Sequence, residues 1–136
     1  MILVDTGPIV ALLDRNDSNH SRCVETAAVL PVAPLLTSWP CLTEAMYLIG
    51  RGTGAPGQES LWSMIQDGLL KLLNVEPDQV SRMAELMRQY RDLPMDIADA
   101  ALVVAAESTG IRQVFTLDGH FRIYRLKDGS VLEVVP

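Results

Sequence analysis

Four acidic side chains stand where an α/β fold would bring carboxylates together. Asp5 directly follows the apolar run 2–4, and Asp118 comes just after a later β-rich run. Glu44 and Asp99 each lie near the start of an expected helix. Ligands of α/β sheets bind beyond the carboxyl ends of the strands, so these acids are expected to face one crevice. Carboxylate oxygens are the preferred ligands of Mg²⁺ and Mn²⁺, and the pattern therefore favours a divalent-cation site.

Any one of these acids also has a simpler explanation, because acidic residues are common in the first turn of a helix. Their surroundings favour a site. Asp99 lies within the apolar run 97–104, and Asp5 follows a strand that reads as buried on both faces. Asp96 is three residues before Asp99, on the same helix face. Only Arg91 among the basic residues lies within five positions of either, so the acids would repel one another without a cation.

Short apolar strands alternate with helical patterns, which predicts an α/β fold with a central, mostly parallel sheet flanked by helices. We expect strands at 2–4, 35–38, 70–75, 113–116 and 130–134. Between them we expect a short helix after Pro8 and helices at about 17–30, about 40–49, 60–68, 77–90 and 95–108, with a loop at 50–57. Asp17 or Ser18 is expected to cap the helix at 17–30, and Gly110 to stop the helix at 95–108.

Length and composition set the class of protein. The 136 residues suffice for one domain, 1–136, and 49% apolar with 21% charged residues is the balance of a folded globule. A net charge of −6 argues against binding nucleic acid through overall charge, although a bound cation would reverse the sign locally. Cys23 and Cys41 lack the spacing of a zinc site or redox pair. With no signal-peptide pattern and no membrane-spanning run, the chain is expected to be cytoplasmic.

Three other classes of protein fit the sequence poorly. The glycine-rich run 50–54 follows a helix and lacks the Gly-Lys-Ser/Thr of a phosphate-binding loop. A receiver-type signalling domain would need an adjacent acidic pair near the first strand and a lysine after the strand that ends at Thr116, where the only later lysine is Lys127. A haloacid-type phosphatase would need an acid at position 7, which is Gly7.

Four segments together resemble a PIN domain of the VapC-toxin type. They are VDTGPIVALLD at 4–14, TEA at 43–45, PMDIADAALV at 94–103 and TLDGHF at 116–121. Their order and spacing, and the length of the chain, agree with that family, and the resemblance covers essentially the whole sequence. It implies a single PIN domain over residues 1–136.

The resemblance also implies the roles of individual residues. It assigns the metal or metals to four catalytic acids, Asp5, Glu44, Asp99 and Asp118. Asp96 belongs to a narrower subgroup and is expected to be auxiliary. The hydroxyls of Thr6 and Thr116, beside Asp5 and Asp118, are expected to orient a carboxylate or a bound water. Gly7 departs from the family, where many members carry a hydroxyl residue.

The activity implied is that of a Mg²⁺-dependent endoribonuclease that leaves a 5′-phosphate and a 3′-hydroxyl, with Mn²⁺ as an alternative metal. Such a cation would lower the pKa of a water and stabilise charge on the leaving oxygen. Structured RNA, tRNA or a ribosomal RNA loop, is the expected substrate. Arg15, Arg51, Arg122 and Arg125 are candidate contacts for it, while His120 is expected at the surface. The alternative is a catalytically weak or inactive PIN-fold binding protein that acts through protein or RNA association.

The resemblance finally implies a partner, a small antitoxin whose tail lies in an apolar groove and reaches the acidic site. Six apolar residues at helical spacing are candidates for that groove: Leu42, Met46, Tyr47, Leu61, Trp62 and Met64. The same spacing would serve the core or a homodimer face equally well, and the core is the more common use. A homodimer is also expected from the resemblance.

Overall fold

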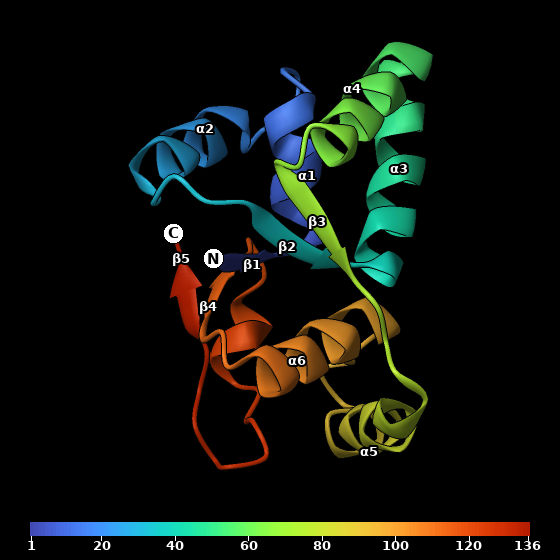
Figure 1. Cartoon of the computed structure of the whole chain (residues 1–136), viewed down its shortest axis with the longest axis vertical. Coiled ribbons are helices and arrows are strands. Elements are labelled where there is room, and N and C mark those ends of the chain that lie inside the picture. Colours follow the sequence, from blue (N-terminus) through green and yellow to red (C-terminus); the bar gives the residue numbers. More distant parts are fainter.

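The computed structural model describes all 136 residues and contains a five-stranded sheet whose neighbouring strands are all parallel (Figure 1). The strands are β1 (Ile2–Val4), β2 (Leu35–Ser38), β3 (Leu70–Leu73), β4 (Gln113–Phe115) and β5 (Glu133–Val135). Their order is β3-β2-β1-β4-β5, so the chain first adds β2 and β3 on one side of β1 and later adds β4 and β5 on the other. The gap beyond the carboxyl ends of β1 and β4 is therefore the topological switch point, the usual ligand crevice of such sheets.

Helices cover both faces of the sheet, which confirms the predicted α/β class. The helices are α1 (Thr6–Leu13), α2 (His20–Val29), α3 (Trp39–Thr53), α4 (Ala55–Gln66), α5 (Val80–Gln89) and α6 (Ile97–Thr109), with short 3-10 turns η1 (Pro77–Gln79) and η2 (Gly119–Arg122). In Figure 1 the blue-to-green helices α1 to α4 lie on one side of the sheet and α5 and α6 on the other.

Alternation along the strands builds a separate core on each face. Leu3 of β1 packs with α5 and α6, whereas Ile2 and Val4 pack with α1 to α4, because successive strand residues point to opposite faces. Nine consecutive residues of α6, Ala98 to Ala106, are buried. Helix α6 is apolar nearly all round because it is enclosed by the sheet, α5 and the segment after β4. The acid that it carries near its start is thus held on a rigid, buried element.

The predicted loop at 50–57 is wrong, because α3 runs to Thr53 and α4 begins at Ala55. Only Gly54 separates them, at a φ of +76° that favours glycine. The other glycines allow close approach between helices: a Cβ on Gly52 would lie 2.7 Å from Asp14 Oδ2, and one on Gly57 would collide with the Thr53 hydroxyl. These glycines therefore make a tight helical hairpin rather than a flexible connector.

The predicted start of the second helix is also wrong. Its N-cap is Asn19, and the helix begins at His20. The Asp17 carboxylate accepts the Asn19 N–H at 2.8 Å in a turn that precedes the helix, which is where Asp and Asn side chains compete with helical hydrogen bonds. Elsewhere the predicted boundaries differ by a few residues, as in β5, which lies at Glu133–Val135.

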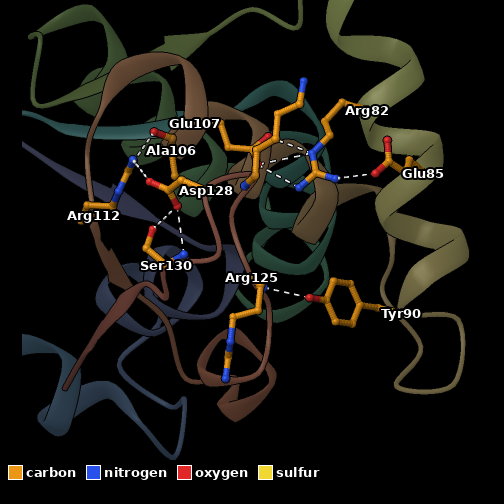
Figure 2. A network of polar contacts seen from close by, with 10 residues as sticks. Arg82, Glu85, Tyr90, Ala106, Glu107, Arg112, Arg125, Asp128 and Ser130 are labelled. Carbon is orange, nitrogen blue, oxygen red and sulfur yellow. Dashed lines mark hydrogen bonds and ion pairs between the residues drawn. The ribbon is translucent and has the colours of Figure 1, made fainter.

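A polar network centred on Glu107 fastens α6 to α5 and to the segment after η2 (Figure 2). Arg82 Nη2 donates to Glu107 Oε2 at 2.9 Å and Arg82 Nε to Oε1 at 3.1 Å, while the Lys127 N–H donates to Oε2 at 2.6 Å. The Arg82 and Glu107 side chains are only 13% and 15% exposed. Glu85 adds an exposed ion pair with the same arginine. The network fixes the far end of the helix that carries Asp99.

None of the helices combines the length and apolar composition needed to cross a bilayer. Both cysteines are free and buried. Burial raises the pKa of the Cys41 thiol to about 12, so the thiol stays protonated.

Candidate active site

Asp5 lies at the centre of the switch point, between β1 and α1, and is only 8% exposed. It caps α1, because its Oδ1 accepts the Thr6 N–H at 2.8 Å. Its Oδ2 accepts the Thr116 hydroxyl at 2.8 Å, across 111 residues of sequence. The Cys41 thiol lies 3.8 Å from Oδ1. Strand β1 therefore delivers this carboxylate to the crevice, and contacts from three other segments hold it there.

The turn after β4 places Asp118 next to Asp5. The Asp118 N–H donates to the Thr116 hydroxyl at 3.0 Å, so that one hydroxyl joins both acidic segments. The Asp118 carboxylate caps η2 by accepting the His120 N–H at 2.9 Å, and His120 Nδ1 lies 3.4 Å from the same oxygen. The His120 side chain is 42% exposed, as a surface position requires. The Thr116 hydroxyl thus orients a carboxylate, that of Asp5, and accepts only the backbone N–H of Asp118.

Glu44 extends from α3 toward Asp5 and is exposed. Thr6 contacts both acids, because its N–H donates to Asp5 Oδ1 at 2.8 Å and its hydroxyl lies 3.3 Å from Glu44 Oε2. The same hydroxyl lies 3.2 Å from the Cys41 carbonyl oxygen. The carboxylate that the Thr6 hydroxyl contacts is therefore Glu44, while the Thr6 N–H donates to Asp5.

Asp99 occupies the first turn of α6 and is 7% exposed. Asp96 is the N-cap of that helix, with Oδ1 accepting the Asp99 N–H at 2.8 Å, which gives it a structural task beside any auxiliary one. A residue that no sequence motif indicated, Tyr124, donates its hydroxyl hydrogen to Asp99 Oδ2 at 2.6 Å. Its only signal was an aromatic residue with a polar tip, three residues after Phe121 on the segment that follows Asp118.

The carboxylates are close enough to influence one another electrostatically. The pKa of Asp99 is raised to about 7, mainly by burial and also by the nearby charges of Asp96, Asp5 and Asp118, against the lowering effect of the Tyr124 hydrogen bond. The pKa of Asp5 is also raised, mainly by burial and then by Asp118 and Asp96. The structure therefore brings Asp5, Asp96, Asp99 and Asp118 into one electrostatic cluster, with Glu44 joined to it through Thr6.

The donor set suits a hard divalent cation. All five acids offer oxygen, and none of them pairs with a lysine or arginine. A cavity of about 580 Å³, bordered by Glu44 and Asp96, opens beside them. No three of the acids are yet arranged as a closed metal-binding group. The residues thus fit Mg²⁺ or Mn²⁺ by the chemistry of their oxygens and by their charge.

An apolar groove adjoins this cavity, on the α3–α4 hairpin. It has a volume of about 390 Å³ and is lined by Trp39, Leu42, Thr43, Met46, Tyr47, Gln58 and Trp62. Four of the six predicted groove residues are among them. Leu61 instead lies in the core with no exposed surface, and Met64 packs partly against that core. Because the tyrosine and both tryptophans are also exposed, the groove is an open apolar surface.

The parallel sheet is doubly wound, and carboxylates from the end of β1, from α3, from α6 and from the turn after β4 gather at its switch point. These features define an α/β domain with an acidic site suited to a cation. The chain belongs to the PIN-domain family, whose model matches residues 2–126.

Similar proteins agree with this assignment. Ribonuclease VapC26 from Mycobacterium tuberculosis is 28% identical over 99% of this chain and 100% of its own length. The crystal structure of VapC20 from the same organism, described as a sarcin-ricin loop cleaving toxin, has a TM-score of 0.79 at 21% identity, covering 88% of this chain and 91% of that one. VapBC2 from Rickettsia felis, bound to a promoter DNA fragment, has a TM-score of 0.66 at 14% identity over the full length of both chains.

Proposed function

We propose that this PIN domain is a divalent-metal-dependent endoribonuclease, the toxin of a two-component module, with Mg²⁺ as its metal and Mn²⁺ as an alternative. The observation that carries the proposal is the cluster of buried and partly buried carboxylates at the switch point, with no basic side chain to neutralise it. The full-length similarity to a ribonuclease of the VapC type supports the reaction. Membership in the family supports the fold on which that reaction is performed.

In this proposal Asp5, Glu44, Asp99 and Asp118 hold the metal, and Asp96 assists by shaping the start of α6. When bound, the cation would supply an activated water and charge stabilisation for hydrolysis of a phosphodiester. The protein's own contribution is orientation: the Thr116 hydroxyl fixes Asp5, and Thr6 connects Asp5 to Glu44. Asp5 and Asp99 are both buried, and no cationic side chain pairs with either of them.

The proposed substrate is structured RNA, a tRNA or a ribosomal RNA loop, since the net charge of −6 gives no general attraction for nucleic acid. VapC20, a structural relative, is described as cleaving the sarcin-ricin loop. Among the predicted arginines, Arg51 lies over the Tyr47 ring with its guanidinium carbon 5.9 Å from the ring centre, beside the apolar groove. Arg125 instead donates to the carbonyl oxygens of three preceding residues, so its cation is partly engaged.

Replacing Asp5 by Ala should abolish Mg²⁺-dependent cleavage of total cellular RNA. The substitution removes the carboxylate that the switch point encloses, and with it the partner of the Thr116 hydroxyl. Asp67→Ala is the matched control, because Asp67 is an exposed acid at the end of α4. Fragments mapped by sequencing, with and without EDTA, identify the target.

Discrete fragments made by the unmodified chain and by Asp67→Ala, but lost in EDTA and in Asp5→Ala, would support the proposal. Equal fragmentation by all three proteins would point to a contaminating nuclease and contradict it. Binding of RNA without cleavage, unaffected by Mg²⁺, would favour the binding-protein alternative.

A small antitoxin protein is the proposed partner, and its proposed binding site is the apolar groove on the α3–α4 hairpin. Solved toxin–antitoxin complexes of this fold support the pairing. Trp62→Glu should weaken binding of the proposed antitoxin by at least roughly tenfold, because buried tryptophans carry much of the energy of such interfaces. Val29→Glu, on exposed α2, is the control for added charge. Titration calorimetry measures both, and equal affinities would place the partner elsewhere.

Sedimentation of the purified chain tests the predicted homodimer.

A further inference from the structure

Tyr124 is a fully buried side chain whose place in the fold the proposed reaction does not yet explain. Its ring packs edge-to-face against Tyr90, with centroids 5.0 Å apart, and against Phe121 at 5.2 Å. It lies two residues beyond η2 and has no exposed surface. A phenylalanine would fill the same space between the two rings. The hydroxyl must therefore be accounted for separately from the packing.

That hydroxyl has a single partner, the Asp99 carboxylate. Tyr124 Oη donates to Asp99 Oδ2 at 2.6 Å, a short, charge-assisted bond. A buried hydroxyl is costly unless it is paired, so this ring cannot sit here without an acceptor. Asp99 in turn receives no other hydrogen bond to its side chain, and its Oδ1 is not sealed from solvent. One oxygen is thus fixed by the protein and the other is left available.

Fixing one oxygen has a specific consequence for an aspartate. The terminal torsion of Asp is broad and roughly two-fold, so an unbonded carboxylate turns easily about it. The Tyr124 hydroxyl removes that freedom and selects which oxygen remains open. Tyr124 is itself held in place, because its ring packs between Tyr90 and Phe121 and its backbone N–H donates to the His120 carbonyl oxygen at 3.2 Å.

We propose that Tyr124 is a positioning residue, whose hydroxyl holds the Asp99 carboxylate in the orientation that binds the divalent cation. This inference rests on the metal-dependent activity proposed above. The tyrosine touches neither substrate nor metal and acts only through Asp99. Together with the bond from Thr116 to Asp5, it gives each buried acid of the site its own orienting hydroxyl.

Tyr124→Phe tests this on the full chain, with Mn²⁺ alone as the probe and no RNA present. Loss of an orienting partner of a metal ligand typically weakens metal affinity about 10- to 100-fold, and we expect the Mn²⁺ dissociation constant to rise by at least tenfold. Electron paramagnetic resonance of free Mn²⁺ measures it. RNA cleavage should recover in large part at saturating Mn²⁺, because the ligands themselves remain.

Tyr90→Phe is the matched control. Tyr90 belongs to the same ring cluster, but its hydroxyl accepts the Arg125 N–H at 2.9 Å and contacts no acid (Figure 2). Its removal should leave Mn²⁺ affinity unchanged. A chain with 4-aminophenylalanine at position 124 keeps the ring and a weaker donor, and we expect intermediate affinity. If Tyr124→Phe does not fold by circular dichroism, this third chain carries the comparison with the unmodified protein.

The outcomes separate the two proposals. Binding of Mn²⁺ by the unmodified chain, with equal affinity in a folded Tyr124→Phe or in the 4-aminophenylalanine chain, would overturn the role of Tyr124 alone. An equal loss of affinity in Tyr90→Phe would do the same, since it would assign the effect to ring packing. No binding of Mn²⁺ by the unmodified chain would overturn the metal-dependent function itself.

Discussion

Replacing Asp99 by Asn is expected to remove RNA cleavage while making the metal-free protein more stable. A bound metal contributes several kcal/mol of charge stabilisation to hydrolysis, so losing one of its carboxylates should slow cleavage by roughly a thousandfold. The same carboxylate is buried among three other acids. Asparagine has nearly the same shape, can still accept the Tyr124 hydroxyl, and carries no charge. In EDTA at pH 8 we expect a gain of roughly 1–2 kcal/mol, or on the order of 5 °C in melting temperature.

The stability difference should depend on pH in a defined direction. The pKa of Asp99 is near 3.8 in the unfolded chain and about 7 in the folded one, so between these values the folded state retains a proton that the unfolded state has lost. The stabilisation is complete below the lower value and disappears as the pH rises through the upper one. The unmodified chain without metal should therefore melt progressively earlier, relative to Asp99→Asn, from pH 5 to pH 8. A gap in melting temperature that does not widen over this range, or a less stable variant, would contradict the clustered acids.

The second large effect is expected at Glu107, far from the acidic site. Glu107→Ala removes the partner of Arg82, whose side chain is only 13% exposed, and frees the Lys127 N–H. Hydrogen bonds to charged groups contribute about 1.5–3 kcal/mol each, and Arg82 would keep only its exposed pair with Glu85. We expect a loss of about 2–3 kcal/mol in the free energy of unfolding, measured by urea denaturation.

Glu85→Ala is the control for that experiment. Glu85 pairs with the same arginine, but its side chain is 62% exposed. Exposed ion pairs contribute little, so this substitution should cost less than about 0.5 kcal/mol. Similar losses in the two variants would mean that the Arg82 ion pairs are equally screened and that α6 is held by its apolar contacts alone.

The sequence predicted the parts of the site that depend on local position. A carboxylate directly after a short apolar strand reaches the carboxyl edge of a parallel sheet wherever the strand lies, which is why Asp5 and Asp118 could be placed before the fold was known. Asp99 could be placed because α6 is apolar on all sides, so an acid within it must be enclosed. These inferences need no knowledge of which other segments lie nearby.

The parts that the sequence did not predict depend on tertiary neighbours. Gly50 and Gly52 read as breakers, yet each lies in α3 where another side chain, Gln58 or Asp14, approaches the backbone. The Thr6 hydroxyl was expected to orient a carboxylate, but the sequence did not indicate that this carboxylate would be the glutamate on α3. Tyr124 was missed because its partner is 25 residues earlier and is reached only through the turn of η2. Such contacts have no periodicity that could be recognised in advance.

The bond from Thr116 to Asp5 joins the first strand to a segment 111 residues later, and this separation has a consequence for protein synthesis. Ribosomes add about 5–20 residues per second, so the first acid waits roughly 5–20 seconds for the segment that orients it. A nascent chain whose β4 and η2 segments have not yet left the ribosome contains only part of the acidic cluster. The proposed nuclease is thus inert throughout most of its own translation, and it becomes competent only after nearly the whole domain has left the ribosome.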